Sequence, residues 1–201
     1  MHRTSNPTAG AGDINAEDAG IDGATGLLQG AAQVLCPHWD ERPPGASLDL
    51  IIVHGISLPP GEFGGPWIDR LFCGDLPAGV HPSFAEVATL RVSAHALIRR
   101  NGAIRQYVQF GARAWHAGQS SWRGRSGCND FSVGIELEGT DQVPYTEAQY
   151  VALAMLVRAL CRTYSSLGID RIAGHSDVAP GRKSDPGAAF DWARLRAALQ
   201  P

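Results

Sequence analysis

The sequence predicts a single α+β domain in which helices flank a central mixed β-sheet. Three observations lead to this fold class. The chain has 201 residues, of which 44% are hydrophobic, and this is enough to bury one sizeable core. Short apolar runs typical of strands alternate with segments of helical spacing, without a strict strand–helix–strand rhythm. The chain also contains no internal repeat.

The strands are predicted from short segments rich in apolar or β-branched residues. Segments 48–54 and 169–173 are such runs, and segment 131–138 ends in an alternation of apolar and acidic residues. Segment 90–107 predicts two strands that form a hairpin, because Asn101-Gly102 lies between them and Asn-Gly is a strong hairpin signal. Together these strands supply the expected sheet.

The helices are predicted over 67–73, 146–168 and 191–199. The middle one has the clearest signals. Thr146 begins it and Gln149, three residues later, completes a capping box. Apolar residues then recur at helical spacing until Gly168, where we expect the helix to end.

The ordered part of the chain is expected over residues 34–201, which we interpret as one catalytic domain. Residues 1–33 are rich in Gly, Ala, Asp and Asn and hold too little apolar content to fold alone, so they are interpreted as a flexible N-terminal extension. They lack the basic and apolar regions of a signal peptide, which favours a cytoplasmic protein. Four cysteines without a CxxC pair fit free thiols in a reducing compartment.

Charge and hydropathy exclude two function classes. The net charge is −3 and no basic run is present, so nucleic acid is not expected as a partner. No apolar run reaches the roughly 18 residues that a membrane span needs.

Two histidines carry the clearest chemical signal, because each lies at the end of a predicted strand. His54 ends segment 48–54, and His175 follows segment 169–173, ahead of a loop with Asp177 and Asp185. Two His and one Asp are a set that catalytic zinc takes, with a fourth position left for water. On pattern alone, two alternatives to a metal site remain open. The histidines can be structural rather than ligands, and Asp185, which precedes Pro186, can be a turn residue. Asp177 is the rival ligand or a loop cap.

Acid–base candidates lie on the same predicted strand and on the loop. Glu136 and Glu138 are two residues apart and therefore share a strand face, so either can be the base. Lys183 is the only lysine among 17 basic residues, which favours a role that needs a compact ammonium over a generic surface cation.

The longer motifs around these residues strongly resemble the AmpD family of zinc-dependent anhydro-N-acetylmuramoyl-L-alanine amidases. The resemblance extends over roughly residues 34–198. Its motifs, in chain order, are IVHGISLPPGEFGG (52–65), LRVSAH (90–95), RAWHAG (113–118), CNDFSVGIELEGTD (128–141), GHSD (174–177), RKSDPG (182–187) and FDW (190–192).

The resemblance implies the mixed-sheet amidase fold shared with peptidoglycan recognition proteins, and a function for each candidate residue. It implies Zn2+ as the cofactor, held by His54, His175 and Asp185. It assigns the catalytic carboxylate to Glu136 rather than Glu138, which is then expected to orient a ligand. It also implies that Lys183 stabilises the negative charge that develops on the carbonyl oxygen.

Substrate contacts are expected from five further residues. Arg91 can grip a carboxylate of the stem peptide, and Trp115 offers a flat face to the sugar or the peptide. The remaining expected lining residues of the cleft are Leu137, Ala179 and Arg125.

Two departures from the family pattern accompany these expectations. Gly55 follows His54 where the family usually has Asn, and Gly127 precedes Cys128 where the family commonly has Arg. Arg125 is therefore expected to reach the same carboxylate from a shifted loop. His95 is expected to be a hydrogen-bonded core histidine, and His116 to form part of the cleft wall.

The function expected from the resemblance is an amidase of peptidoglycan recycling. The enzyme hydrolyses the amide bond between the lactyl group of 1,6-anhydro-N-acetylmuramic acid and L-alanine, and its partner is an anhydro-muropeptide substrate. Two alternatives stay open: a non-catalytic peptidoglycan-binding module of the same fold, and a periplasmic wall amidase.

Overall fold

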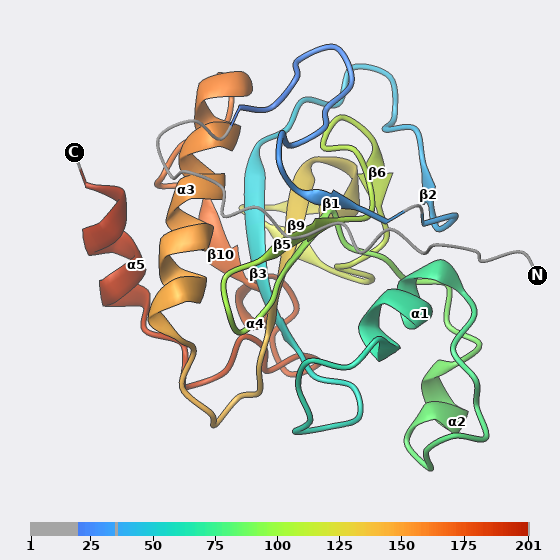
Figure 1. Cartoon of the computed structure of the whole chain (residues 1–201). Helices are drawn as coiled ribbons and strands as arrows, with labels where there is room; N and C mark the ends of the chain where they lie inside the picture. The colour runs from blue at the N-terminus through green and yellow to red at the C-terminus, as the bar shows by residue number, and fades with distance from the viewer. Residues whose placement is uncertain (1–19, 35, 201) are drawn as a thin grey trace, which may run out of the picture.

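The computed structural model describes residues 20–34 and 36–200, and a six-stranded sheet lies at its centre (Figure 1). All neighbouring strands run parallel except β4 and β5, which are antiparallel. The mixed sheet expected from the sequence is therefore confirmed. From edge to edge the strands are β1 (Ala32–Gln33), β5 (Ile104–Gln106), β4 (Ala96–Ile98), β9 (Ser132–Glu138), β3 (Leu50–Ile56) and β10 (Ile172–Gly174).

The two long strands β3 and β9 lie side by side and carry the site residues. Every residue of β9 is buried, as are the first five of β3. Their register pairs His54 with Glu136. Because side chains alternate along a strand, Val133, Ile135 and Leu137 enter one core cluster and Glu136 lies on the opposite face of the sheet.

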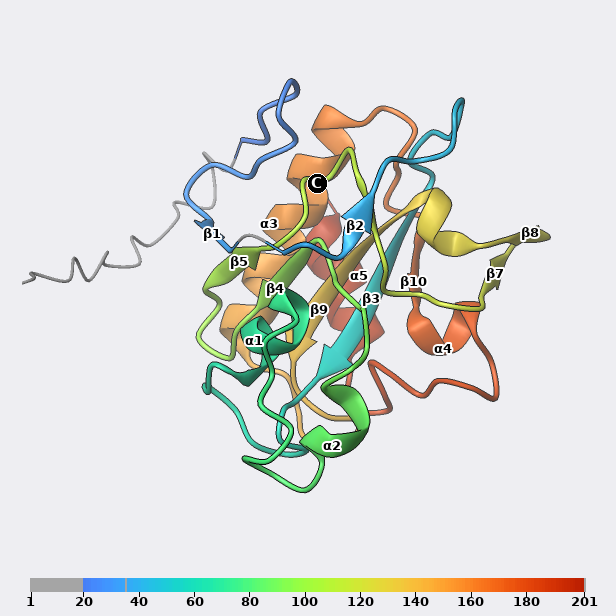
Figure 2. The same ribbon diagram turned by 90° about the vertical axis from the view of Figure 1, so that its right-hand side faces the viewer.

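Helices cover both faces of the sheet, as Figures 1 and 2 show. The hydrophobic core on one face is closed by α3 (Glu147–Thr163) and α5 (Trp192–Leu199). A second cluster on the other face contains residues of α1 (Trp67–Cys73) and α2 (Phe84–Val87). A third cluster, also on that face, lies under α4 (His175–Val178) and the short 3-10 helix η1 (Cys128–Asp130).

Two small sheets lie outside the central one. Strands β2 (Trp39–Asp40) and β6 (Arg113–Ala114) pair antiparallel, and β7 (Ser121–Trp122) pairs with β8 (Arg125–Ser126) in a hairpin. The β7–β8 hairpin leads into η1 through Gly127, whose φ of 71° is in the left-handed region that favours glycine.

Several predicted elements are confirmed, with shifted ends. The hairpin over 90–107 exists as β4 and β5, but β4 begins only at Ala96. The capping box of Thr146 and Gln149 begins α3 as expected. The helix ends at Thr163 rather than at Gly168, because Tyr164 adopts an extended backbone (φ −116°, ψ 96°).

The C-terminal part of the chain shows two further differences. The strand expected over 169–173 is β10, which starts at Ile172 and reaches Gly174. The segment after it, expected as a loop, begins with the single turn α4, in which Asp177 Oδ2 accepts the Gly174 N–H at 2.7 Å. The final helix is α5, with Asp191 as its N-cap.

The ordered domain begins before residue 34, so that predicted boundary is wrong. Strand β1 pairs with β5, and Leu28 is 2% exposed within the main core cluster. Local signals for this boundary are weak, because the segment has few apolar residues and its strand β1 pairs with the distant strand β5. The remainder of the predicted extension, residues 1–19, lies outside the described residues.

One arginine joins several backbone segments beneath the site. The guanidinium of Arg42 donates to the carbonyl oxygens of Asn129 and Ser132, both at 2.9 Å. It also donates to Gly111 at 3.2 Å and Phe110 at 3.3 Å. These bonds fix η1 and the start of β9 relative to the segment before β6.

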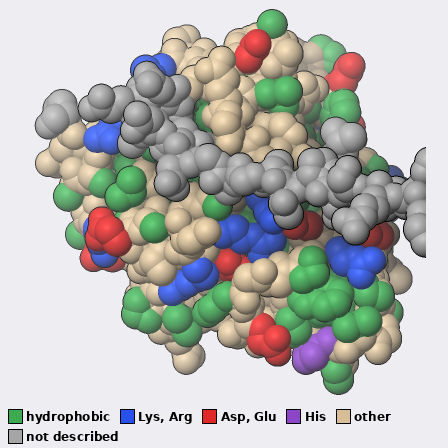
Figure 3. Space-filling model, viewed as in Figure 1, with side chains coloured by type: hydrophobic (Ala, Val, Ile, Leu, Met, Phe, Trp, Pro, Cys, Tyr) green, Lys and Arg blue, Asp and Glu red, His purple; other side chains and the backbone are tan. Residues whose placement is uncertain are grey.

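The surface seen in Figure 3 mixes basic and acidic side chains, and hydrophobic side chains gather over α1 and α2. Within residues 20–34 and 36–200, no helix has the length and apolar character needed to cross a membrane.

Candidate metal centre

Three predicted ligands converge at one end of the β3–β10 pair. His54 Nδ1 lies 3.0 Å from His175 Nδ1 and 3.2 Å from Asp185 Oδ2, and His175 Nδ1 lies 3.1 Å from the same oxygen. The register explains the two histidines, since Gly174 pairs with Val53 and each is followed by a histidine. Asp185 joins them because its carbonyl accepts the Ser176 N–H at 2.9 Å, which folds the loop back onto α4.

The chemistry of these three atoms fits a divalent metal ion. His175 Nε2 lies 3.2 Å from the carbonyl oxygen of Ala117, which only accepts, so in the neutral ring Nε2 carries the proton and Nδ1 is bare. Burial lowers the pKa of His54 to about 4, so this ring is neutral at pH 7. Two imidazoles and a carboxylate that direct electron pairs at one point are a typical metal-ligand set.

Glu136 lies beside this triad on the same face of the sheet. It pairs with His54 in the register of β3 and β9 and is 9% exposed. Its Oε2 atom is buried without a hydrogen-bond partner among the described residues. Burial raises the pKa of Glu136 well above its ordinary value, the charge of Asp185 adds to this, and the charge of Lys183 opposes it. A raised pKa makes this carboxylate a stronger base, which favours the uptake of a proton.

Lys183 is exposed and lies on the loop that ends in Asp185. Its positive charge acts on two site residues, because it lowers the pKa of both His54 and Glu136 as a minor contribution. The loop is anchored where the carbonyl of Ala179, at the end of α4, accepts the Lys183 N–H at 3.1 Å. Ala179 is itself buried beside this loop.

The two rival carboxylates have other partners. Asp177 caps α4 through the Gly174 N–H, as one of the two sequence interpretations expected. Glu138 is 1% exposed, and its Oε1 atom accepts from Arg99 at 2.9 Å and from the Gly64 N–H at 2.6 Å. The expectation that Glu138 orients a metal ligand is therefore wrong, because its carboxylate anchors the loop before α1.

The two remaining histidines near the site differ in outcome. His95 is fully buried, accepts the Gly134 N–H at 3.0 Å and lies 3.1 Å from the Ala112 carbonyl, so the predicted core histidine is confirmed. His116, expected in the cleft wall, is half-buried and lies beside the triad. Its ring meets the His54 ring edge-on at 5.0 Å between centroids, and its Nδ1 lies 3.0 Å from His54 Nε2.

Gly55, where the family usually has Asn, has a structural explanation. A Cβ atom at this position would lie closer than 3.0 Å to the hydroxyl oxygen of Tyr145. That buried hydroxyl donates to the Pro186 carbonyl at 3.0 Å, next to the ligand Asp185. Tyr145 therefore fills the space beside His54 and supports the ligand loop.

Arg91 and Trp115 form a separate group. The Arg91 guanidinium lies 5.4 Å from the centroid of the Trp115 ring, and the Trp115 indole N–H donates to Asp40 at 3.0 Å. His38 stacks near the same ring at 6.0 Å between centroids. The chain links this group to the triad, since Trp115 precedes His116.

Two predicted cleft residues lie elsewhere. Leu137 is fully buried in the core under α3, on the opposite face of β9 from Glu136, so its side chain does not line the cleft. The Arg125 side chain pairs with Asp49 at 3.1 Å and lies over Phe131 at 3.9 Å. Asp49 precedes β3, about 16 Å along the strand from His54 at about 3.3 Å per residue. The expectation that Arg125 reaches the stem carboxylate is therefore wrong, because the β7–β8 hairpin carries it to the other end of the sheet.

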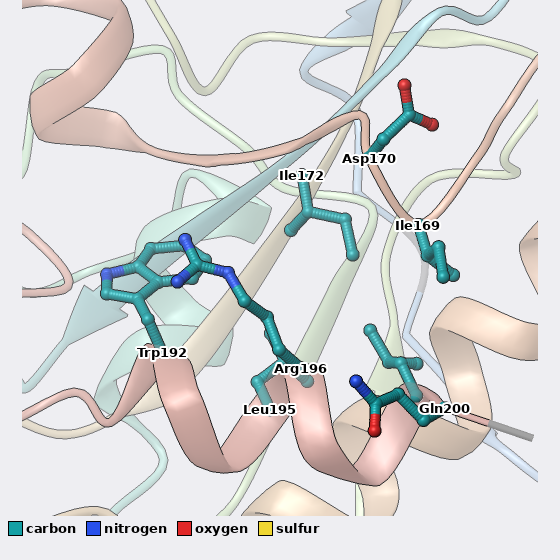
Figure 4. A pocket seen from close by; sticks show the side chains of 8 residues that line it. Ile169, Asp170, Ile172, Trp192, Leu195, Arg196 and Gln200 are labelled. Atoms are coloured by element: carbon teal, nitrogen blue, oxygen red, sulfur yellow. The ribbon is translucent and has the colours of Figure 1, made fainter.

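A groove of about 320 Å³ lies between β10 and α5 (Figure 4) and contains none of the predicted site residues. It is lined mainly by apolar side chains. These come from Ile169, Asp170, Ile172, Trp192, Leu195, Arg196, Leu199 and Gln200.

Sequence reasoning missed three residues that support the site: Tyr145, Ser132 and Gly134. Signals existed for two of them. Gly55 in place of a larger residue indicates that another group fills the space, and Gly134 inside the buried run 131–138 indicates a close approach. Nothing in the sequence indicates that the group above Gly134 is the His116 ring, which comes from a distant loop.

Comparisons with known proteins agree with this geometry. A family profile described as N-acetylmuramoyl-L-alanine amidase matches residues 44–188. The 1,6-anhydro-N-acetylmuramyl-L-alanine amidase AmpD of Escherichia coli K12 is 60% identical over 171 residues, which cover 85% of this chain and 93% of that protein.

Solved structures show the same fold. A crystal structure of a selenomethionine AmpD derivative has a TM-score of 0.85 and 56% identity, and the match covers 88% of this chain and 98% of that one. The amidase AmiD of Escherichia coli, solved with the substrate anhydro-N-acetylmuramic acid-L-Ala-D-γ-Glu-L-Lys, has a TM-score of 0.55 and 28% identity. That match covers 79% of this chain and 60% of AmiD.

Proposed function

The chain belongs to the N-acetylmuramoyl-L-alanine amidase family, and from this premise we propose that it is a zinc-dependent amidase of peptidoglycan recycling. The bond it hydrolyses is the amide between the lactyl group of 1,6-anhydro-N-acetylmuramic acid and L-alanine of the stem peptide. One observation supports this most: His54, His175 and Asp185 direct their ligand atoms at one point, within 3.2 Å of one another, beside the buried Glu136.

His54, His175 and Asp185 are the residues that would hold the zinc ion. Two imidazole nitrogens and one carboxylate oxygen favour zinc over the harder divalent ions, which prefer oxygen ligands. When bound, zinc supplies a Lewis acid that polarises the scissile carbonyl and lowers the pKa of water.

Glu136 is the proposed general base and acid. Its carboxylate takes a proton from the water molecule that adds to the carbonyl carbon, and then delivers this proton to the departing amine nitrogen of L-alanine. Burial and the charge of Asp185 raise the pKa of Glu136, which favours the uptake of the proton from water. Its Oε2 atom has no hydrogen-bond partner in the described part of the chain, so it is available to contact the water.

Lys183 is the proposed electrostatic partner. Its ammonium lies close enough to influence both Glu136 and His54. It can donate to the carbonyl oxygen as negative charge develops there, and the bond to Ala179 anchors the Lys183 backbone beside the site.

Substrate recognition is proposed for Arg91, Trp115 and Ala179. The exposed Arg91 guanidinium contacts the Trp115 ring and has no carboxylate partner among the described residues, so it is available to a stem-peptide carboxylate. Trp115 is held by Asp40 and offers an apolar surface to the sugar or the peptide. We also propose a cytoplasmic location, which the recycling function supports.

The test is product analysis by mass spectrometry. Purified protein is incubated with anhydro-muramyl-tripeptide and with its non-anhydro counterpart, first with stoichiometric zinc and then with a chelator. We expect free tripeptide from the anhydro substrate only, and none after chelation. Cleavage of both substrates would instead indicate a general wall amidase, and binding without cleavage would indicate a recognition module.

A matched pair of variants tests the ligand assignment. Asp185→Asn is expected to abolish zinc binding, whereas Asp177→Asn, on the same loop, is expected to retain it, because Asp177 only caps α4. Equal zinc binding by both variants would refute Asp185 as a ligand. Fractionation of cells between cytoplasm and periplasm tests the proposed location.

A further inference from the structure

A chain of three hydrogen bonds leads from His54 into the protein interior. His54 Nε2 lies 3.0 Å from His116 Nδ1, and His116 Nε2 lies 3.3 Å from Ser132 Oγ. Ser132 Oγ in turn donates to the carbonyl oxygen of Cys128 at 2.6 Å. We call His116, Ser132 and the Cys128 carbonyl the relay.

The relay has one possible direction, because its inner end can only accept. The Cys128 carbonyl takes the single hydroxyl hydrogen of Ser132, so Ser132 Oγ can only accept from His116 Nε2–H. A neutral His116 ring with its proton on Nε2 has a bare Nδ1, which must accept from His54 Nε2–H. His54 Nδ1 is then left without a proton, and this is the atom that faces His175 and Asp185.

The surroundings hold the His116 ring in this place. A Cβ atom on Gly134 would lie closer than 3.0 Å to several atoms of the ring, so the ring fits only because residue 134 is a glycine. The backbone N–H of His116 donates to Asn129 Oδ1 at 3.2 Å, and Ser132 is fully buried.

Ala117, the residue after His116, fixes the tautomer of the second ligand, His175. The Ala117 carbonyl faces His175 Nε2 at 3.2 Å and leaves His175 Nδ1 bare. The short segment 116–117 therefore sets the tautomers of both ligand histidines.

We propose that His116 and Ser132 are positioning residues, which fix the tautomer and ring orientation of His54 so that its Nδ1 electron pair is directed at the metal site before the metal arrives. Partners of this kind around a metal site typically affect metal affinity about 10- to 100-fold. The proposal rests on the metal site of the proposed function, but it concerns residues that do not touch the metal.

The first test needs no variant. Nitrogen-15 NMR of the metal-free wild-type protein distinguishes the two imidazole tautomers. The relay predicts that His54 and His116 both carry their proton on Nε2. A proton on His54 Nδ1 at pH 7 would overturn the proposal.

The second test measures zinc affinity by competition with a chelator. His116→Leu removes the acceptor for His54 and is expected to weaken zinc binding about 10- to 100-fold. His116→Asn keeps an amide oxygen near the position of Nδ1 and is expected to recover most of that loss. Ser132→Ala removes the acceptor of His116 and is expected to weaken zinc binding as well, with both tautomers of His54 visible by NMR.

Ser93→Ala is the matched control for Ser132→Ala. Ser93 is 1% exposed, and its hydroxyl also donates to a carbonyl, that of His38, at 2.6 Å, and accepts the Trp115 N–H at 2.9 Å. It contacts no member of the relay itself. Zinc affinity is expected to stay unchanged in Ser93→Ala. If folded His116→Leu and Ser132→Ala bind zinc as tightly as the wild type, the relay is refuted; if the wild type binds no zinc, the proposed function fails instead.

Discussion

Replacing Gly55 by alanine is expected to destabilise the protein only while Tyr145 keeps its hydroxyl group. The backbone at residue 55 belongs to strand β3 and can accept alanine without strain. The new Cβ would lie closer than 3.0 Å to the Tyr145 hydroxyl oxygen, whereas the nearest ring carbon, Cζ, is at 3.6 Å, an ordinary contact. The clash therefore comes from a single oxygen atom.

The contacts of Tyr145 determine the cost of each substitution in the free energy of unfolding. Tyr145 cannot move aside, because it is 5% exposed and its hydroxyl donates to Pro186. Overpacking of this kind costs about 1–3 kcal/mol in Gly55→Ala. Tyr145→Phe leaves the Pro186 carbonyl without its donor, which costs about 1–3 kcal/mol. In the double variant the clash is gone, so its cost is expected to equal that of Tyr145→Phe alone.

The assay is a double-mutant cycle on the free energy of unfolding, measured with urea on the metal-free protein. We expect the double variant to be more stable than the sum of the single effects by about 1–3 kcal/mol. Additive costs would refute the reasoning, because they would mean that the Tyr145 hydroxyl does not occupy the space beside Gly55. The double variant is not expected to gain zinc affinity over Tyr145→Phe, because both lack the hydroxyl that bonds Pro186 and supports the Asp185 loop.

Three further outcomes are expected. Glu136→Gln should lower kcat about 10²- to 10⁴-fold while the zinc dissociation constant stays unchanged; a wild-type rate by mass spectrometry would contradict the assigned base. Burial lowers the pKa of His95 to about 3, so below pH 6.5 the unfolded chain binds a proton that the folded protein does not. The contribution of His95 to the free energy of unfolding therefore falls as the pH drops below 6.5, by up to about 1.4 kcal/mol per pH unit. His95→Gln should flatten urea-derived stability between pH 6.5 and 5, and an unchanged slope would count against the buried neutral ring. A lysine cannot donate to all four carbonyls, so Arg42→Lys should cost at least about 3 kcal/mol, or about 6–12 °C in Tm. Arg70→Lys should leave Tm unchanged, because the Arg70 side chain is 43% exposed and pairs with Asp75 at the surface. Equal Tm values for the two variants would show that the Arg42 bonds contribute little.

The periodic parts of the fold could be predicted from the sequence because their signals are local. The capping box of Thr146 and the Asn-Gly hairpin each lie within a few residues, and both are confirmed. The predicted C-terminal end of α3 is wrong, because the extended backbone of Tyr164 ends the helix before Gly168. The early part of the domain was missed because β1 is short and pairs with the distant strand β5.

The candidate ligands could be predicted because His54 lies in a strand, His175 follows one and Asp185 lies in a motif. What surrounds them could not, because each partner comes from far along the chain. Strand alternation indicates that Glu136 and Glu138 share a face, but only the fold shows that Arg99 and Gly64 engage Glu138. The resemblance also did not indicate that the β7–β8 hairpin places Arg125 away from the site.

The position of β10 gives the two histidine ligands unequal protection from local opening. His54 lies on β3, which is bonded to a strand on both sides, whereas His175 follows a three-residue edge strand bonded to β3 alone. Edge strands with few ladder bonds open at a free-energy cost below that of global unfolding. Amide hydrogens of β10 should therefore exchange before those of β3 and β9 in the metal-free protein. A bound ion would link the edge strand to the centre of the sheet. It should therefore slow amide hydrogen exchange more at β10 than at the central strands β3 and β9.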